Sequence, residues 1–388
     1  MNGSVVIVGG GVMGAATACF LARDHGAAVT VIERDPSYSR ASSALSASSI
    51  RQQFSQGVNI ALSQWSLGFM RRVGDELAVG DERPAIGLVE PGYLYLATAA
   101  GADTLRQNHL TQLQHGADVA LLTSAPLRRH FPWLHCDDVR LAALGLTGEG
   151  WFDGPALMQA FRRKALDCGA RWVHAEASGF QVQDRRIQAV RCTDGSAHGA
   201  DTVVLAPGAW VAPLAAQLHC CLPVAPRKRD VFVFDSPARV PACPLVIDPS
   251  GLWFRPEGRS FICGAPPRHG DPDEPPLEAI DHAQFEEQLW PALAHRVPGF
   301  EALRLRSAWA GYYEMNTFDQ NGLAGALPGW NNVFTACGFS GHGMQQAPAV
   351  GSALAALIAG GRSEAPSIEA LSPERLRLNH PLVERNVI

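Results

Sequence analysis

The stretch SVVIVGGGVMGAATACFLARDHGAAVTVIERD, residues 4–35, decides the fold. It opens with a short apolar run rich in β-branched residues, which predicts a buried strand. Three glycines then follow at the spacing G-x-G-x-x-G: Gly9, Gly11 and Gly14. Small residues repeat at helical spacing up to Gly26, whose position suits the residue just beyond a helix end. A second apolar run ends at Glu33, so the stretch predicts strand, glycine turn, helix and strand.

Each part of this turn has a physical role in binding a dinucleotide. The first glycine allows the tight turn, the second lets backbone approach a pyrophosphate, and the third lets helix and strand pack closely. At the start of the helix, around Val12 and Met13, we expect free N–H groups at a positive helix end that attracts phosphates. Glu33, with Arg34 beside it, is placed to bind the adenosine ribose and disfavours NADP. The motif does not separate NAD from FAD, and a merely structural turn is the alternative.

Composition places the chain among globular proteins. It has 388 residues, of which 47% are hydrophobic and 18% charged, with a net charge of −5 and no basic stripe. Two domains fit this length, and nucleic acid is not an expected partner. Nine cysteines without a C-x-x-C pair match neither a disulfide framework nor a zinc ligand set, so we expect no metal site and a reducing, cytoplasmic location. No apolar run approaches the ~18 residues of a membrane span, and we expect no signal peptide.

Elements of the same kind recur in the middle and near the end of the chain. The run DTVVLAPGAW, residues 201–210, reads as a buried strand leading into a turn. Residues 333–348 read as strand, glycine turn and helix. Between residues 220 and 310 prolines become dense and strands alternate, which indicates a mainly antiparallel insertion. One nucleotide-binding domain interrupted by insertions explains this order.

These segments together resemble the D-amino-acid oxidase/sarcosine oxidase (DAO) family of FAD enzymes over nearly the whole chain. The N-terminal glycine motif, VVLAPGAW and GFSGHGMQQAPAVGSALAALI carry the resemblance. The segments SIRQQFS, GEGWFD, GYYEMNTFDQNG and GFSGHGMQQAP are most similar to the branch of mitochondrial FAD-dependent oxidoreductase domain-containing proteins, relatives of the dimethylglycine and sarcosine dehydrogenases. The resemblance implies an α/β (α+β) fold. A Rossmann-like FAD-binding domain of glutathione-reductase type (1–85, 146–220, 311–388) would carry an inserted, mainly antiparallel β substrate domain (86–145, 221–310).

The resemblance also implies which residues hold the cofactor. Glycines in the turn at 338–343 would let backbone N–H groups approach the pyrimidine edge of the flavin, beside the positive end of the next helix. The expected FAD-binding residues are Gly9, Gly11, Val12, Met13, Gly14, Glu33, Arg34, Ser42, Ser43, Ser48, Ser49, Ala206, Gly208, Trp210, Gly338, Ser340, Gly341, His342, Gly343, Met344 and Gln345. As simpler alternatives, serines fill tight turns, and a glycine turn can need only a positive φ.

Several side chains are candidates for contact with the substrate. The resemblance places Arg51 near the flavin, where an arginine stabilises the reduced ring or binds a carboxylate; a solvated surface arginine is the alternative. Arg255 is a second carboxylate clamp or another surface residue. His342 is a candidate catalytic base, although an imidazole that supports the flavin edge is the preferred interpretation. A dry aromatic pocket, or alternatively core packing, is expected of Tyr312, Tyr313, Trp253 and Phe254.

Three departures from the family pattern bear on the reaction. Gln345 stands where monomeric sarcosine oxidases place a lysine that binds the substrate carboxylate, which argues against plain N-methylglycine. The segment SFICGAPPRHG lacks the lysine with which those oxidases activate oxygen, which favours a dehydrogenase. The flavin-linking cysteine of sarcosine oxidases is replaced near Tyr312, and residues 44–48 hold no linking histidine. We therefore expect non-covalent FAD.

The expected function is oxidation of the C–N bond of a secondary or tertiary amino acid by hydride transfer to flavin N5. The substrate would be like sarcosine or dimethylglycine, or a larger N-substituted amino acid. Its partners would be this small-molecule amine and an electron acceptor, either oxygen or an electron carrier. A FAD-dependent 2-hydroxy acid dehydrogenase is the chemical alternative, and a flavin-loaded assembly or interaction protein is the alternative of another class.

Overall fold

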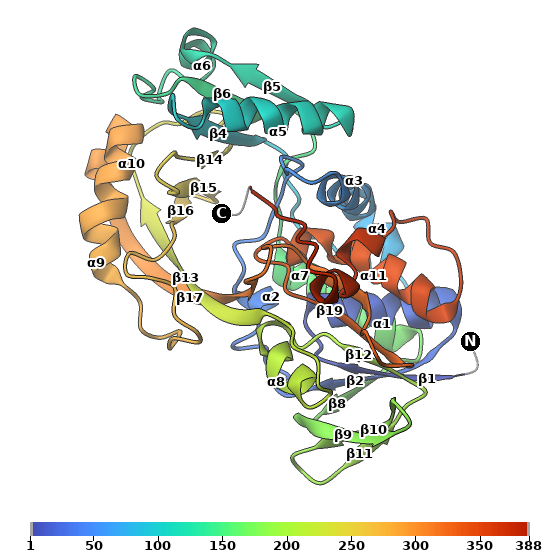
Figure 1. Cartoon of the computed structure of the whole chain (residues 1–388). Helices are drawn as coiled ribbons and strands as arrows, with labels where there is room; N and C mark the ends of the chain where they lie inside the picture. Colours follow the sequence, from blue (N-terminus) through green and yellow to red (C-terminus); the bar gives the residue numbers. More distant parts are fainter. Residues whose placement is uncertain (1–2, 386–388) are drawn as a thin grey trace.

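The computed structural model describes residues 3–385 and contains two large sheets (Figure 1). One sheet is largely parallel and the other largely antiparallel, so the predicted fold class is confirmed. The extreme ends of the predicted FAD-binding domain, residues 1–2 and 386–388, lie outside the described residues. The exact domain boundaries stay a prediction.

The parallel sheet has six strands in the order β18-β19-β12-β1-β2-β8. All neighbours are parallel except β18 and β19. Its strands are β1 (Ser4–Val8), β2 (Ala28–Glu33), β8 (Arg171–His174), β12 (Thr202–Leu205), β18 (Leu323–Ala326) and β19 (Val333–Cys337). Both faces are covered, because Val5 and Ile7 pack among helices while Val6 and Val8 pack against a small antiparallel sheet. This two-sided burial explains why β1 is apolar throughout.

Helices cover one face of the parallel sheet and a three-stranded sheet covers the other (Figure 1). The main helices are α1 (Val12–His25), α3 (Gly57–Arg71), α7 (Gly154–Asp167) and α11 (Gly343–Ala359). The small sheet is formed by β9 (Ala177–Gln183), β10 (Arg186–Cys192) and β11 (Ala197–Gly199). Helix α7 has a side-chain N-cap, because the Asp153 side chain accepts a hydrogen bond from the N–H of Ala156.

Helix α3 buries a partly polar face. Val58 and Trp65 lie on one apolar stripe at helical spacing, but these side chains are only partly buried. Polar residues occupy much of the truly buried face, among them Asn59 and Ser66, which are fully buried. Both are paired across the helix interface: the Asn59 side chain accepts from the Gln346 amide, and Ser66 accepts from a backbone N–H of α11. The buried face of α3 is therefore set by its polar partners on α11. The hydrophobic periodicity of α3 alone does not reveal these partners.

The large antiparallel sheet has eight strands in the order β17-β13-β16-β15-β14-β4-β6-β5. Only the pair β4 and β14 is parallel. Its strands are β4 (Tyr93–Ala97), β5 (Val119–Leu122), β6 (Leu141–Gly145), β13 (Val224–Asp235), β14 (Leu245–Ile247), β15 (Trp253–Glu257), β16 (Ser260–Gly264) and β17 (Arg304–Asn316). The long pair β13 and β17 reaches from this sheet toward the parallel one (Figure 1). A separate phenylalanine-rich core fills this layer.

The remaining elements are shorter than the main helices. They are α2 (Ser42–Leu45), β3 (Ser49–Ile50), α4 (Val73–Glu76), α5 (Ala102–Gln114), α6 (Ser124–His130), β7 (Gly150–Trp151), η1 (Gly208–Trp210), α8 (Val211–Ala216), α9 (His282–Gln284), η2 (Phe285–Leu289), α10 (Trp290–Arg296), η3 (Pro298–Ala302), η4 (Glu369–Leu371) and α12 (Glu374–Arg377). Strands β3 and β7 pair with each other, and this tie holds the residue before Arg51 in place.

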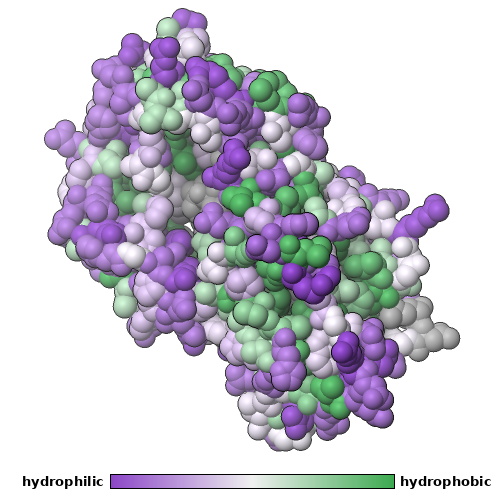
Figure 2. Space-filling view, in the orientation of Figure 1, coloured by the Kyte–Doolittle hydropathy of each residue, from purple (hydrophilic) through white to green (hydrophobic). Residues whose placement is uncertain are grey.

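The surface agrees with the composition. Hydrophilic residues cover most of the face shown in Figure 2, and hydrophobic residues gather near the middle of the view. Within residues 3–385, the structure contains no helix that is both long enough and apolar enough to pass through a bilayer.

Candidate active site

A cavity of about 510 Å³ lies where the two large sheets meet. Its walls come from the turn after β1, the loop after β2, the turn after β12, the strand β17 and the start of α11. It is bordered by these predicted site residues: Gly9, Gly11, Val12, Met13, Glu33, Arg34, Ser42, Ser43, Ser48, Ser49, Arg51, Ala206, Gly208, Trp210, Tyr312, Ser340, Gly341, His342, Gly343, Met344 and Gln345. The two glycine turns, far apart in sequence, therefore meet at one cavity.

Three predicted site residues do not border this cavity, which corrects the sequence analysis. Gly14 packs behind it: a Cβ there would lie 1.9 Å from the Gly9 carbonyl oxygen, so its role is helix–strand packing. Gly338 has a φ of 70° and its missing Cβ would lie 2.9 Å from Val224. Arg255 is neither a clamp nor a surface residue. It is buried, forms an ion pair with Glu257 and donates a hydrogen bond of 2.7 Å to the Ala47 carbonyl.

Glu33 and Arg34 lie at the end of the cavity next to the first glycine turn. The Glu33 carboxylate accepts the backbone N–H of Gly10 at 2.7 Å, which couples the end of β2 to the glycine turn. The Arg34 guanidinium lies 4.0 Å from the centroid of the Trp210 ring, a cation–π contact. The indole N–H of Trp210 in turn donates to Glu274 at 2.7 Å. A basic, aromatic and acidic group thus close over this end.

The residues present fit a dinucleotide with a flavin ring. Helices α1 and α11 both start at the cavity, and neither start has a side-chain cap from its own N-cap residue. Such helix starts offer N–H groups to a phosphate or a polar ring edge. Several buried polar atoms at the cavity make no hydrogen bond within the chain, namely Ser42 Oγ and both ring nitrogens of His342. Buried polar atoms of this kind are normally paired, so a bound polar group is their natural partner.

Arg51 is held at the cavity by residues of α11 and β4 and by Phe54 of its own loop. Its backbone N–H donates to Gln345 Oε1 at 2.7 Å, which ties it to the start of α11. Its guanidinium donates to the Tyr95 hydroxyl and lies 4.3 Å from the Phe54 ring centroid. Only 3% of the residue is exposed, so the alternative of a solvated surface arginine is wrong. A buried and fixed cation at a cavity wall is suited to binding an anion.

Glu149 supports the backbone that follows Arg51. It accepts the N–H groups of Gln52 and Gln53 at 2.6 and 3.1 Å and the Gln53 amide at 2.8 Å. Burial raises the pKa of Glu149 to about 7, even though these hydrogen bonds favour the ionised form. Its segment, GEGWFD, carries part of the family resemblance, but nothing in its sequence indicated this role for Glu149.

His342 is a neutral imidazole at the cavity wall. Burial and then the positive charge of Arg51 hold its pKa well below the ordinary value. Its ring packs edge-on against Phe54, with centroids 5.1 Å apart. A histidine that resists protonation in this way is poorly suited to take up a proton as a base near neutral pH. The arrangement favours the supporting role over the catalytic one.

Sequence reasoning missed several residues of the cavity, chiefly Glu314 and Arg229. Glu314 accepts the N–H of Phe339 at 3.3 Å, and burial raises its pKa to about 7. Arg229 lies 5.2 Å from the Tyr313 ring centroid and forms a bidentate pair with Asp271. Both are ionisable residues within strands, Glu314 in GYYEM and Arg229 in PRKRD. An ionisable residue in such a strand was the sequence signal that could have identified them as site candidates.

Tyr312 also borders the cavity, but its hydroxyl is already engaged. It donates to the Pro275 carbonyl at 2.7 Å and accepts a hydrogen bond of 3.4 Å from the Arg40 guanidinium. This hydrogen bond to Pro275 links β17 to the 271–281 segment. The aromatic residues Tyr93, Trp253 and Tyr313 also contribute to the lining, whereas Phe254 belongs to the core of the antiparallel layer.

A parallel βαβ sheet with two helix starts at one cavity, joined to an antiparallel layer that closes it, belongs to the class of Rossmann-like dinucleotide-binding proteins. Residues 4–357 match the family model for FAD dependent oxidoreductases, DAO. The chain belongs to this family, which confirms the resemblance drawn from the sequence. FAD is therefore its cofactor and oxidation–reduction its chemistry.

The chain is similar to several known members. It is 41% identical over 422 residues to FAD-dependent oxidoreductase domain-containing protein 1 of Xenopus laevis, covering 99% of this chain and 84% of the relative. It is 30% identical to glycine oxidase of Geobacillus kaustophilus, covering 91% of this chain and 92% of the enzyme. The crystal structure of L-proline dehydrogenase from P. horikoshii superposes with a TM-score of 0.85 at 26% identity, covering 97% and 98% of the two chains.

Proposed function

We propose that this protein oxidises the C–N bond of a secondary or tertiary amino acid. The observation that carries the proposal is Arg51, a buried cation fixed at the cavity wall by Gln345. A guanidinium in this setting binds a carboxylate with charge-assisted hydrogen bonds. Similar proteins named as a glycine oxidase and an L-proline dehydrogenase support an amino acid as the substrate.

The rest of the cavity favours an uncharged amine. Tyr93, Trp253 and Tyr313 provide aromatic surface beside Arg51. Burial against such surface lowers the pKa of an amine, because the charged form loses its water. FAD, when bound, accepts the hydride from the carbon next to nitrogen. Arg51 would orient the substrate, Gln345 and Glu149 would hold Arg51, and no side chain needs to act as a base, which agrees with the neutral state of His342.

We also propose that FAD is held without a covalent link and that the protein works in a reducing compartment such as the cytoplasm. The linkage region at 44–48 reads Ala-Leu-Ser-Ala-Ser, and Tyr312 uses its hydroxyl on Pro275. All nine cysteines are free thiols. Acid precipitation of the purified protein tests the linkage, because released FAD colours the supernatant and covalent FAD colours the pellet.

An anaerobic flavin-bleaching screen tests the reaction. The FAD-loaded protein is mixed with N-methylated amino acids, proline, larger N-substituted amino acids and 2-hydroxy acids, and flavin absorbance is followed. We expect bleaching by an N-substituted amino acid and its loss in Arg51→Gln. Bleaching by 2-hydroxy acids alone would replace the proposal with the 2-hydroxy acid dehydrogenase. Bleaching by dithionite but by no substrate would favour the assembly or interaction protein.

The electron acceptor is tested in the same preparation. After the substrate has bleached the flavin, the rate at which flavin absorbance recovers is measured once with dissolved oxygen and once with an artificial electron carrier. The two rates are then compared. The absence of a lysine from SFICGAPPRHG supports slow recovery with oxygen and fast recovery with the carrier, the behaviour of a dehydrogenase. Equally fast recovery with oxygen would identify an oxidase.

A further inference from the structure

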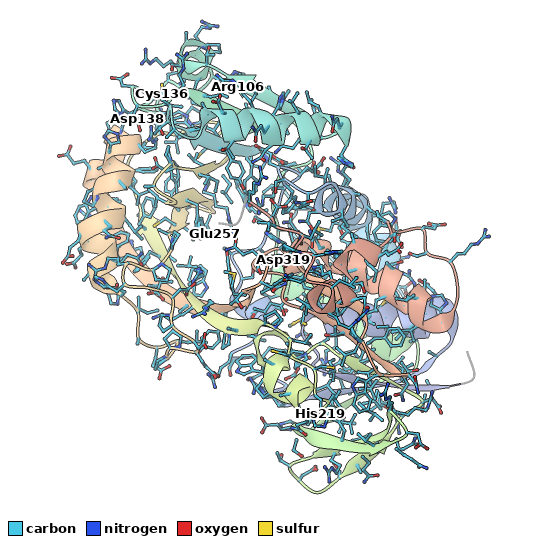
Figure 3. All side chains as sticks on the ribbon, in the orientation of Figure 1. Arg106, Cys136, Asp138, His219, Glu257 and Asp319 are labelled. Atoms are coloured by element: carbon cyan, nitrogen blue, oxygen red, sulfur yellow. The ribbon has the colours of Figure 1, made fainter. Side chains whose placement is uncertain are left out.

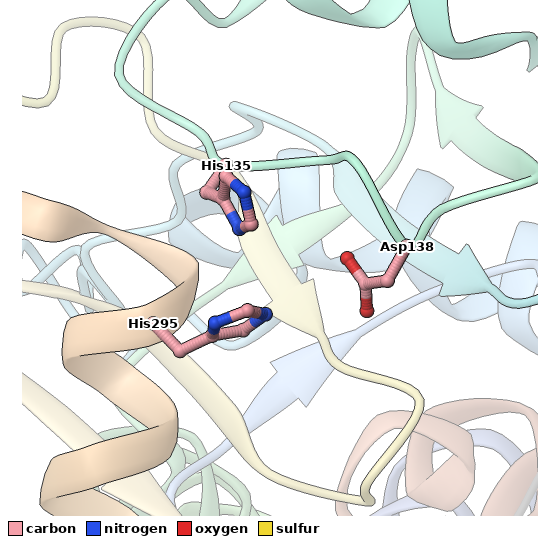
Figure 4. A group of neighbouring side chains, drawn as sticks. All are labelled: His135, Asp138 and His295. Atoms are coloured by element: carbon pink, nitrogen blue, oxygen red, sulfur yellow. The ribbon is translucent and has the colours of Figure 1, made fainter.

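His135, Asp138 and His295 form a compact group in the antiparallel layer, away from the cavity. One ligand-type atom of each, a ring nitrogen or a carboxylate oxygen, lies within 4.8 Å of the other two. Figure 4 shows the two imidazoles and the carboxylate turned toward a shared space. The imidazole rings are 4.6 Å apart between centroids and meet edge to face. Nδ1 of His135 is buried and makes no hydrogen bond within the chain.

Arg296 fixes His135 and Asp138 through hydrogen bonds. Its carbonyl accepts the N–H of His135 at 2.8 Å, and its guanidinium donates to the His135 carbonyl at 2.6 Å. The same guanidinium forms two hydrogen bonds of 2.9 Å with Asp138 and one of 2.6 Å with Asp248. Arg296 is 1% exposed, so this frame is part of the core. Two chain segments that are far apart in sequence are thereby placed in a fixed relation.

The charges and ligand types suit a divalent metal ion. The single positive charge of Arg296 faces two carboxylates, Asp138 and Asp248, so the group is negative before any ion binds. A carboxylate oxygen that already accepts from arginine keeps a further lone pair for a metal. Two imidazoles with one carboxylate are ligands that zinc and related transition ions prefer, whereas magnesium and calcium prefer oxygen alone.

We propose that His135, Asp138 and His295 bind one zinc-like divalent transition metal ion, with water at the fourth position. Ligands of tetrahedral zinc lie roughly 3.3 Å apart, so small side-chain rotations close the site. His295 is exposed and therefore able to rotate, whereas Asp138 stays paired with Arg296. The ion would fasten the loop between α6 and β6 to the end of α10. This reverses the expectation of no metal site, which rested on cysteine spacing alone.

Because the group lies away from the cavity, we infer a structural role for the ion. Figure 3 places Asp138 beside the end of α10, at the outer edge of the antiparallel layer. None of the three ligands borders the cavity. An ion here would stabilise the layer that closes over the cavity without touching the reacting atoms, and the inference does not depend on the proposed reaction.

Zinc titration of the FAD-loaded protein tests the proposal. After EDTA treatment and desalting, zinc binding is measured by calorimetry and thermal unfolding is followed with zinc and, separately, with magnesium. We expect one zinc per chain and a Tm rise of about 3 °C at roughly a hundredfold excess over Kd. Magnesium should have no effect, because it disfavours imidazole ligands.

Three single variants sharpen the result. His135→Gln and His295→Gln each remove one imidazole and should weaken zinc binding at least about tenfold. His269→Gln, an exposed histidine outside the group, should bind zinc like the parent. Equal Tm values of all four proteins in EDTA confirm that the variants fold. Absence of saturable zinc binding, or binding that survives both His135→Gln and His295→Gln, would overturn the proposal.

Discussion

At the scale of the residue, Gln345 has a task that a lysine at the same position could not perform. Its amide oxygen accepts the backbone N–H of Arg51 at 2.7 Å, and both residues are buried. A lysine has three donors and no acceptor, so it would leave that N–H without a partner. Gln345 therefore supports Arg51. Under the proposed function, binding of the substrate carboxylate would then depend on Arg51.

We expect Gln345→Ala to raise KM for the amine substrate about tenfold. Loss of the acceptor leaves a buried N–H unpaired, which costs about 1–3 kcal/mol and lets Arg51 shift. The matched control is Gln346→Ala, which removes the neighbouring buried amide and its bond to Asn59 but not the tie to Arg51. Steady-state kinetics of both variants decide the matter. A similar KM increase in the control would show that Gln345 has no special effect on Arg51.

The raised pKa of Glu149 leads us to expect that the free energy of unfolding depends on pH. Its pKa is raised from 4.5 to about 7 in the folded protein. A carboxyl group with a raised folded pKa keeps its proton longer when folded than when unfolded, so the stability that it contributes falls as pH rises through this window. The fall is up to about 3 kcal/mol. Urea unfolding of the FAD-loaded protein between pH 4.5 and 8 measures it, and Glu149→Gln should flatten the slope. An unchanged slope in the variant would contradict the assignment.

At the scale of the element, the crossing of α1 and α11 brings both glycine turns to the cavity. A Cβ at Gly351 would lie 2.7 Å from the Ala16 Cβ and 3.0 Å from its carbonyl carbon. The two helices can approach this closely only because small residues face each other. Since each helix starts at the cavity, the separation of the helix axes determines where their first N–H groups lie. The small-residue repeat in α1 is therefore a packing feature with a consequence for binding.

We expect Gly351→Ala to destabilise the protein by about 1–3 kcal/mol and to weaken FAD binding, because overpacking pushes the helices apart. Gly68→Ala in α3 is the control, since its added Cβ meets only the end of Arg72 at 3.7 Å. Alanine is the better helix former, so this control should be neutral or stabilise by about 0.5–1 kcal/mol. Thermal unfolding and FAD titration of both variants measure the contrast. Equal effects of the two substitutions would show that the crossing is not tight.

At the scale of the whole molecule, the cavity is shared between two layers with separate cores. One core surrounds α1, α7 and α11, and the other lies under the antiparallel sheet. Arg229 and Tyr313 reach the cavity from the long β13–β17 pair, while Gly11 and Ser43 reach it from the nucleotide side. A cofactor bound there contacts both layers, so its binding energy contributes to holding them together.

Removal of FAD should therefore lower thermal stability. A ligand that binds only the folded chain adds about 2.7 kcal/mol at a concentration of one hundred times Kd. Calorimetry of the apoprotein with increasing FAD should show a Tm that rises with the logarithm of FAD concentration. Riboflavin, which lacks the pyrophosphate and adenosine, is the control and should have a much smaller effect. A Tm that does not depend on FAD would contradict binding at this cavity.

Local patterns were sufficient for much of the fold and part of the site. The glycine spacing after β1, the acid at the end of β2 and the turn before α11 are contiguous signals, and each was located from the sequence. The second glycine motif could be tied to the first only through family resemblance. The role of Arg255 was predicted wrongly, because a strand pattern indicates only which face of the sheet a residue lies on. It does not indicate which side chain, here Glu257, pairs with that residue. Glu314 and Glu149 were passed over because each is a single acid in an apolar stretch.

The sequence by itself determined the βαβ unit, the dinucleotide site at its glycine turn and the antiparallel character of the insertion, because these depend on backbone freedom and on periodicity over neighbouring residues. Only the tertiary structure decided that Gln345 supports Arg51, that Glu149 is buried behind it, and that His135, Asp138 and His295 meet. Such pairings join residues from distant parts of the chain. Their energies depend on burial and on distances between side chains, which exist only once the two layers have packed.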